Sequence, residues 1–437
     1  MLAIVLWEDL AVAAPDVPAR IVVDDDLTRS RVTVFFRLVL FVPHLVWLVL
    51  WTIAALLGAI ANWFATLATG RPPAALYRFL AAYVRYATHV SAFVLLAANP
   101  FPGFTGAPGS YPVDVELAPP EQQHRLKTLF RIVLAIPALA LAAAIRSTGA
   151  AARAGDSNGT YSFSFDIGIL AACAFLGWFV CLALGRMSQG FRNAIAWGLG
   201  YSAQVNAYVF LLTDRYPNSD PGATGVLGIP PEHTIRLRVD DDLRRSRLTV
   251  FFRLLLFIPH LVWLVLWGLA VFVAAIANWF ATLALGRSPR PLHRFLSAYL
   301  RYQAHAFAFL TLVANPFPGF VGRPGSYPID LEVAGPERQH RLKTLFRIFL
   351  AVPALMVNSA LGTLSALAAF LGWFAALATG RMPTGLRNVG AWALRYGLQA
   401  DAYLYLVTDR YPYSGPEAGE PAEPEPEPEP EPAPLTA

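Results

Sequence analysis

Four related units, each dominated by a long apolar run, make up most of this sequence. The stretch RSRVTVFFRLVLFVPHLVWLVLW at 29–51 returns as RSRLTVFFRLLLFIPHLVWLVLW at 245–267, an offset of 216 residues. Each half is itself doubled, because an Arg-x5-Pro element followed by Trp-Phe and Gly-Arg occurs twice within it. Four quasi-repeats therefore begin near residues 31, 125, 247 and 341.

The composition shows which environment these units require. Of the 437 residues, 56% are hydrophobic and 14% are charged, whereas about a quarter of the residues in soluble domains are charged. These values exclude an ordinary soluble enzyme and a disordered chain. Cys173 and Cys181 lie within one apolar run and form neither a disulfide framework nor a CxxC motif. The sequence therefore predicts an all-α polytopic membrane protein.

The length of the apolar runs bears on how often each unit crosses the bilayer. The run at 36–70 contains one charge, Arg37. As a single helix it would measure about 52 Å, against a hydrocarbon core of about 30 Å. The equivalent run of the second unit is interrupted at 146–166 by charged and polar residues, which cannot face lipid at mid-bilayer. We therefore expect each unit to begin with a transmembrane helical hairpin of two short spans.

An amphipathic segment follows each apolar run, at 74–98 in the first unit. Its Arg78, Arg85 and His89 fall on one stripe of a helix. We expect this segment to be an interfacial helix, which gives eight spans in all. A tilted third crossing in each unit would instead give twelve spans.

The distribution of charge predicts an orientation and a partner. Of the 34 Lys and Arg residues, Arg146 and Arg153 alone fall on the hairpin-turn side. The positive-inside rule then places the unit starts, the Gly-Arg motifs and both termini in the cytosol of a bacterial cell, in a multi-pass plasma-membrane protein. The basic body indicates anionic lipid headgroups as the first partner, in preference to nucleic acid.

Short stretches with a period of two lie between the units, at 21–23, 111–117, 234–239 and 327–333. They predict cytosolic β-strands, which either pair into a small sheet or remain separate linkers. The resulting divisions are an N-terminal segment at 1–30, a first membrane domain at 31–217, a linker at 218–246, a second membrane domain at 247–412 and an acidic tail at 413–437. The tail has a repeated Glu-Pro pattern, typical of an extended solvated chain that acts as a spacer or docks a cytosolic protein.

The Arg-x5-Pro element is the first candidate site, because it recurs in every unit. A proline early in a span kinks the helix, and the arginine can extend to the headgroups as an anchor. Alternatively, four arginines could bind a lipid phosphate or carboxylate through bidentate contacts. The candidate lipid or ligand residues are Arg37, Arg131, Arg253 and Arg347.

Four further polar residues lie within the apolar runs of the odd units. His44 and His260 follow the proline and fit either a hydrogen bond to a neighbouring helix, a proton relay or a haem ligand. Asn62 and Asn278 precede Trp-Phe and favour packing between helices. The triplet Asp24 to Asp26 and its copy at 240–242 suggest helix capping and ion pairing with the arginines that follow, rather than binding of a divalent cation.

Catalytic and nucleotide-binding motifs such as GxSxG, HExxH and Walker A are missing from the sequence. We expect no metal and no cofactor, and the oligomeric state stays open. The leading hypothesis is a non-enzymatic scaffold or envelope factor that engages anionic lipid. The competing hypothesis is a transporter or channel built from the internal repeats, with His44 and His260 relaying protons.

The combined motifs FR-x4-(I/V)-P-H, WF-x5-GR, TDRYP and YPVDVEL resemble a bacterial integral-membrane family that is catalogued only as a domain of unknown function. This family is common in actinobacteria and often occurs in tandem. The resemblance covers about residues 20–412, although the odd units carry NPFPGF where the family tends to have TDRYP. It implies a membrane location and no known activity or catalytic residues.

Overall fold

The computed structural model describes residues 19–153, 162–224 and 233–417. Each unit contains a short lead-in helix, a long apolar helix and a shorter third helix. In the first half these are α2 (Arg31–Phe35), α3 (Arg37–Thr69) and α4 (Ala74–Val94), followed by α5 (Arg125–Leu129), α6 (Arg131–Arg146), α7 (Ile169–Leu184) and α8 (Gln189–Val209). In the second half they are α9 (Arg247–Phe251), α10 (Arg253–Leu285) and α11 (Arg290–Leu310), then α12 (Arg341–Leu345), α13 (Arg347–Thr379) and α14 (Thr384–Leu404).

The expected transmembrane hairpins are wrong for three units, because α3, α10 and α13 each continue for 33 residues. Gly58 and Gly268, the glycines within the apolar runs of the odd units, lie inside helical backbone. An apolar run without a stop signal continues as helix, and the early prolines such as Pro43 do not end it. Each long helix ends instead at the glycine of its Gly-Arg motif, where Gly70 adopts φ 77° and its equivalents are likewise left-handed.

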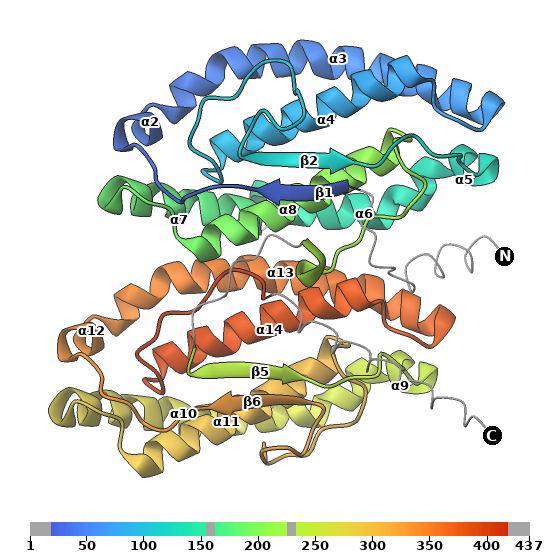
Figure 1. The fold of residues 1–437 in the computed structure, drawn as a ribbon. Coiled ribbons are helices and arrows are strands. Elements are labelled where there is room, and N and C mark those ends of the chain that lie inside the picture. The colour runs from blue at the N-terminus through green and yellow to red at the C-terminus, as the bar shows by residue number, and fades with distance from the viewer. Residues whose placement is uncertain (1–18, 154–161, 225–232, 418–437) are drawn as a thin grey trace, which may run out of the picture.

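In the second unit the polar stretch is an insertion into a long helix. Strands β3 (Thr148–Arg153) and β4 (Ser162–Ile167) pair antiparallel, with Thr148 opposite Ile167. The chain leaves the helix at Ser147 and returns at Gly168, whose amide donates to the Ser147 carbonyl at 2.6 Å. Helices α6 and α7 therefore follow one another along α8 as two halves of one interrupted helix (Figure 1).

Within each half the two units run antiparallel. The amide of Met187, after the Gly-Arg turn of the second unit, donates to the Leu27 carbonyl at the start of the first unit, at 2.8 Å. Reciprocally, the Gln123 amide donates to the Gly70 carbonyl at 2.9 Å. The start of one unit therefore lies beside the Gly-Arg turn of the other unit of its half, and the two long helices of each half point in opposite directions (Figure 1).

The strands between units form two separate ribbons and not one sheet. Strand β1 (Ala19–Val23) pairs antiparallel with β2 (Val113–Leu117), and β5 (Ile235–Val239) pairs with β6 (Ile329–Val333). Alternation places Ile21 and Val115 in the core, whereas Arg20 and Glu116 are exposed. Because β1 pairs with a strand between the first two units, the chain from Ala19 onward packs together with those units.

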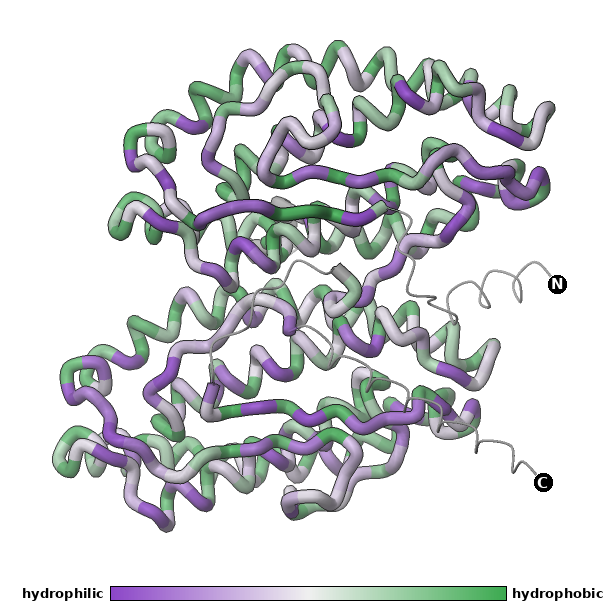
Figure 2. Tube along the Cα trace, viewed as in Figure 1, coloured by the Kyte–Doolittle hydropathy of each residue, from purple (hydrophilic) through white to green (hydrophobic). Residues whose placement is uncertain are grey.

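The elements form three layers, with the polar ribbons on one side and the long apolar helices on the other (Figures 1 and 2). The third helices lie between them: α4 contacts both α3 and β2, and α8 contacts α6, α7 and β1. The face of α4 with Arg85 and His89 meets β2, whereas its Tyr86 contacts His44 of α3. The third helices are therefore the middle layer of the fold and not isolated interfacial helices.

The two halves pack side by side through α13, which lies against α6 and α7. Between the third helices, the ring centroids of Trp197 and Trp392 lie 5.0 Å apart. A short 3-10 helix, η1 (Pro221–Thr224), lies against α14 at the start of the linker.

The first residues of the predicted tail also belong to the fold, because Tyr413 accepts a hydrogen bond from Asn193 and Glu417 pairs with Arg395. The Glu-Pro repeat at 418–437 lies outside the described residues.

Candidate membrane interface

The outer face of the long helices is a broad apolar surface. Helix α3 contacts the rest of the chain through one stripe, and most of its other large apolar side chains are exposed. Three helices, α3, α10 and α13, are long and apolar enough to cross a membrane. On α10 the exposed set is Leu254, Leu255, Leu256, Ile258, Leu261, Val262, Trp263, Val265, Leu266, Leu269, Phe272, Val273, Ile276, Phe280 and Leu285. A surface of this extent exceeds the apolar patches of soluble monomers and is typical of a lipid contact.

Exposed arginines mark both ends of this surface. At each unit start an arginine donates to a carbonyl near the C-terminus of the neighbouring long helix; for example, Arg31 Nη2 lies 3.0 Å from the Ala183 oxygen. The acceptor carbonyls are the negative end of the helix dipole, so the contact is favourable. The same bond recurs in the other units. We call these four residues the start arginines: Arg31, Arg125, Arg247 and Arg341.

A second exposed set comes from the Gly-Arg motifs, where the backbone of Arg186 bridges to Thr28 beside the start of the first unit. Start arginines and Gly-Arg arginines therefore gather at the same helix ends. We call this second set the turn arginines: Arg71, Arg186, Arg287 and Arg381.

The four arginines of the Arg-x5-Pro element are buried and bound within their own units. In the odd units Arg37 donates to the Phe93 and Ala98 carbonyls, and Arg253 makes the same bonds one half later. In the even units Arg131 pairs with Asp214 at 2.8 Å and Arg347 pairs with Asp409 at 2.9 Å. Because each guanidinium is at most 2% exposed, these residues anchor helix ends and do not present a ring to lipid phosphates.

This arrangement explains why the units alternate between NPFPGF and TDRYP. Asn99 of the first motif and Asp214 of the second both approach the buried arginine of their unit. Where carbonyls satisfy the guanidinium, a neutral Asn follows. Where they do not, Asp supplies a counter-charge, which a buried arginine requires.

His44 and His260 hold the NPFPGF loops against the long helices. His44 Nδ1 lies 2.9 Å from the Tyr86 hydroxyl, and its ring stacks on Phe104 with centroids 4.5 Å apart. His260 repeats both contacts with Tyr302 and Phe320. These contacts favour the structural interpretation over a proton relay. Among the described residues, no group of three His, Cys, Asp or Glu side chains is placed to hold a metal ion.

Asn62 and Asn278 connect the two units of each half. Asn62 Nδ2 donates to the Phe210 carbonyl at the end of α8, and Asn278 donates to the Tyr405 carbonyl at the end of α14, both at 2.9 Å. Each carbonyl belongs to the third helix of the neighbouring unit, which is the packing role that the sequence favoured.

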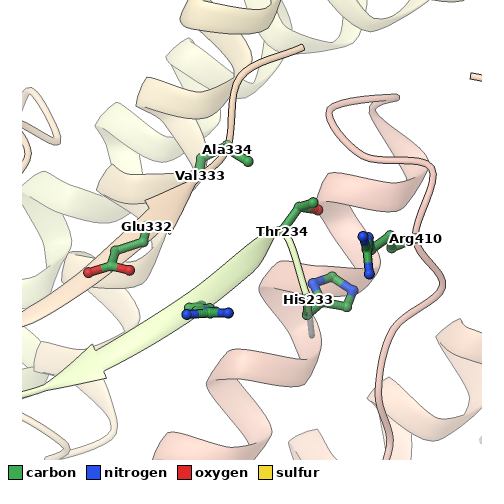
Figure 3. Close-up of a pocket in the computed structure, with 7 residues that line it drawn as sticks. His233, Thr234, Glu332, Val333, Ala334 and Arg410 are labelled. Atoms are coloured by element: carbon green, nitrogen blue, oxygen red, sulfur yellow. The ribbon is translucent and has the colours of Figure 1, made fainter. Parts of the chain in front are cut away.

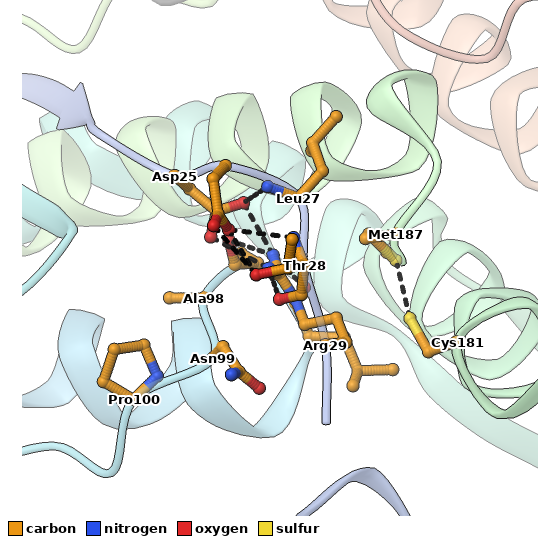
Figure 4. Close-up of polar contacts among 12 residues, drawn as sticks. Asp25, Leu27, Thr28, Arg29, Ala98, Asn99, Pro100, Cys181 and Met187 are labelled. Carbon is orange, nitrogen blue, oxygen red and sulfur yellow. Dashed lines mark hydrogen bonds and ion pairs between the residues drawn. The ribbon is translucent and has the colours of Figure 1, made fainter. Parts of the chain in front are cut away.

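The aspartate triplet forms an ion pair and local turn hydrogen bonds, and not the expected helix cap, because the N-cap of α2 is Ser30, whose hydroxyl accepts from the Thr33 amide. Asp25 binds Arg29 through both oxygens, at 2.9 and 2.7 Å, and Asp26 accepts from the Thr28 amide and hydroxyl (Figure 4). Arg29 also donates to the Leu96 and Ala97 carbonyls at the end of α4. Asp241 and Arg245 repeat the pair in the second half.

The carbonyl that Arg29 binds belongs to a feature that the sequence analysis missed. Each third helix ends at a leucine in the left-handed region, with φ between 62° and 65°, a conformation that costs a non-glycine residue of order 1–3 kcal/mol. A side chain from the start of the same unit binds its carbonyl oxygen in every case, from Arg29, Gln123, Arg245 and Gln339. The leucines are Leu96, Leu211, Leu312 and Leu406. The two partners lie 67 residues apart in three units and 88 apart in the second, which carries the inserted ribbon, so only their recurrence in every repeat could have signalled the contact.

Two pockets open on the ribbon side of the molecule. One, of about 400 Å³, is lined by His233, Arg236, Glu332 and Arg410 among others (Figure 3). Burial lowers the pKa of His233 below its usual value. The second, of about 590 Å³, lies over β2 and includes Asp114. Burial opposes ionisation of Asp114, but hydrogen bonds from His89 and two amides hold its pKa below the usual range.

Comparison with known proteins identifies the repeat. The model of a domain of unknown function, DUF4389, matches residues 31–105, 165–219, 247–321 and 341–414. These four segments correspond to the four structural units and cover more than half of the chain. The chain belongs to the DUF4389 family. Its second DUF4389 match begins at the end of β4 and covers α7 and α8, which agrees with a ribbon inserted into the long helix of that unit.

Searches of curated proteins and of solved structures give no match. The membership of the DUF4389 family therefore confirms the tandem repeat, and it brings no activity, substrate or catalytic residue.

Proposed function

We propose that this DUF4389 protein is a non-enzymatic membrane scaffold whose long helices engage anionic lipid at the plasma membrane. The observation that carries the proposal is the apolar surface of the long helices together with the start and turn arginines at its ends. Apolar area supplies insertion energy, and each arginine near an anionic surface adds about 1 kcal/mol.

The polar ribbons then face the cytosol, where they and the acidic tail are available to protein partners. Two pockets of the described residues open at these ribbons, on the side available to such partners. The buried histidines favour a scaffold over a proton-relaying transporter, because their contacts hold the NPFPGF loops.

The proposal is tested by diluting purified protein from detergent into preformed vesicles and floating them. We expect recovery with phosphatidylcholine vesicles to rise when phosphatidylglycerol is included, and to fall again at high salt. Equal recovery with and without phosphatidylglycerol would contradict the anionic-lipid claim.

Matched charge variants locate the contact. Changing the four turn arginines to Gln should weaken binding to anionic vesicles at least tenfold, given about 1 kcal/mol for each charge. The control removes four exposed arginines of the ribbons and loops, Arg20, Arg236, Arg238 and Arg323, and should leave binding within about twofold. Equal losses in both variants would show that net charge matters and that the helix ends do not.

A further inference from the structure

We propose that the four long helices lie in the plane of a single anionic leaflet, so that the chain docks on one face of the membrane without crossing it. This inference rests on the proposed membrane function and assigns the orientation of the same surface. The occupant of the apolar face is one lipid leaflet, and the ribbons face the water above it.

The length of the helices is the first argument. A 33-residue helix measures about 50 Å, against a hydrocarbon core of about 30 Å. Spanning the core would require a tilt of about 53°, beyond the range of 0–40° found for membrane helices. Exposed apolar side chains continue to both ends of α10, from Leu254 at 76% to Leu285 at 64%. A crossing orientation would therefore leave apolar surface in water at the ends, whereas an in-plane orientation covers all of it.

The position of the ribbons is the second argument. Midway along α3, the Thr52 hydroxyl bonds the Tyr83 hydroxyl of α4 at 2.9 Å. Two residues later, Arg85 of α4 donates to the carbonyl of Val115, the centre of β2, at 3.0 Å. The middle of the ribbon is therefore level with the middle of the long helix. The second half repeats this through Arg301 and the Leu331 carbonyl.

A crossing orientation would place these ribbons at the centre of the bilayer. Each is a two-stranded ribbon with unpaired edges and exposed charges such as Arg20 and Glu116. Unpaired backbone groups and exposed charges are not tolerated against hydrocarbon. When the helices lie in the plane, the ribbons rise above them by two layers of roughly 10 Å each and reach water.

The distribution of basic residues is the third argument. Because neighbouring units are antiparallel, each end of the helix layer carries two unit starts and two Gly-Arg turns. A crossing orientation would put nearly equal numbers of arginines on both sides of the membrane, contrary to the positive-inside rule. The hairpin prediction had placed nearly all basic residues on one side of the membrane, and continuous helices remove that asymmetry. In the plane of one leaflet, all start and turn arginines reach the same headgroups.

The orientation is tested by cysteine accessibility in native membranes. The background replaces the two buried native thiols, Cys173→Ala and Cys181→Ala. Single cysteines are then placed at the two ends of α10 (Ser246→Cys and Arg287→Cys), on the ribbon (Glu332→Cys) and at mid-helix on the apolar face (Leu269→Cys). A membrane-impermeant maleimide is applied to right-side-out and inside-out vesicles.

We expect the cysteines at 246, 287 and 332 to react from the same side and the cysteine at 269 to react from neither side until detergent is added. Reaction of the two helix-end cysteines from opposite sides would overturn the in-plane orientation, as would reaction at 269 in intact vesicles. The equivalent pair Ser30→Cys and Arg71→Cys repeats the test in the first unit if a variant fails to accumulate. Opposite-side reaction would leave the anionic-lipid proposal intact, because that proposal depends on vesicle binding and not on sidedness.

Discussion

In each even unit, the stability of the buried arginine should depend on a single carboxylate, that of Asp214 or Asp409. Arg347 donates through Nη2 to Gln339 at 2.7 Å and to Asp409 at 2.9 Å, and its guanidinium stacks on the Tyr403 ring. The arginine side chain is 1% exposed and the aspartate 18%. The perturbation is Asp409→Asn, which keeps the shape and one acceptor oxygen but removes the counter-charge.

Removing one partner of a buried ion pair costs about 3–5 kcal/mol. We expect the lower end, about 3 kcal/mol, because Asp409 is partly exposed and its amide replacement still accepts a hydrogen bond. The odd unit supplies the reciprocal change, Asn315→Asp, beside Arg253. There the guanidinium already binds two backbone carbonyls, so the added carboxylate should be neutral or stabilise the fold by up to about 1 kcal/mol.

The measurement is unfolding in mixed micelles of a mild detergent and a rising fraction of sodium dodecyl sulfate, followed by tryptophan fluorescence. Asp409→Asn should move the midpoint to lower dodecyl sulfate, and Asn315→Asp should not. If both changes altered the free energy of unfolding by less than 1 kcal/mol, or by equal amounts of the same sign, the explanation of the alternating NPFPGF and TDRYP motifs would be refuted.

Three other expectations follow from single side chains. Burial raises the pKa of Asp401 to about 6, so ionisation of this carboxyl destabilises the fold increasingly as pH rises from 4 to 6. In thermal unfolding, Asp401→Asn should therefore stabilise the fold by up to about 3 kcal/mol above pH 6 and have no effect near pH 4. At Gly106, with φ 59°, an added Cβ would lie 2.1 Å from a backbone oxygen of α4, so Gly106→Ala should lower the unfolding temperature, whereas Gly103→Ala, which meets nothing within 4 Å, should not. His44→Phe leaves the buried Tyr86 hydroxyl unpaired and should cost about 1–3 kcal/mol; restoration of most of this loss by Tyr86→Phe would confirm the cause, and no recovery would contradict it.

Local signals in the sequence were sufficient to predict the repeat, the helical class and several contacts. The 216-residue offset predicted two equivalent halves, and the structure repeats the Asp25–Arg29 pair as Asp241–Arg245. Ion pairing within a few residues depends on chain-local geometry, which residue type and spacing specify, whereas the predicted helix cap is wrong, because Ser30 and not an aspartate is the N-cap of α2. The packing role of Asn62 was predicted in kind, although its partner, the Phe210 carbonyl, could not be named.

The hairpin prediction failed because the polar stretch of one unit was extended to all four. At 146–166 that stretch is a ribbon inserted into a helix, and the helix resumes at Gly168 beside the point where it stopped. Sequence polarity shows that a segment leaves the apolar surface, but it does not show whether the chain reverses there.

The sequence by itself determined that four apolar units with basic flanks must meet a membrane, because hydrophobic area and charge are additive properties of residues. The tertiary structure alone decided which side chains remain available to that membrane. Arg37 and Arg31 are both arginines at the start of the first unit, yet Arg37 is buried against the end of α4 and Arg31 is exposed beside the neighbouring helix end. That difference arises from contacts between segments more than fifty residues apart, and no local pattern of residues records such contacts.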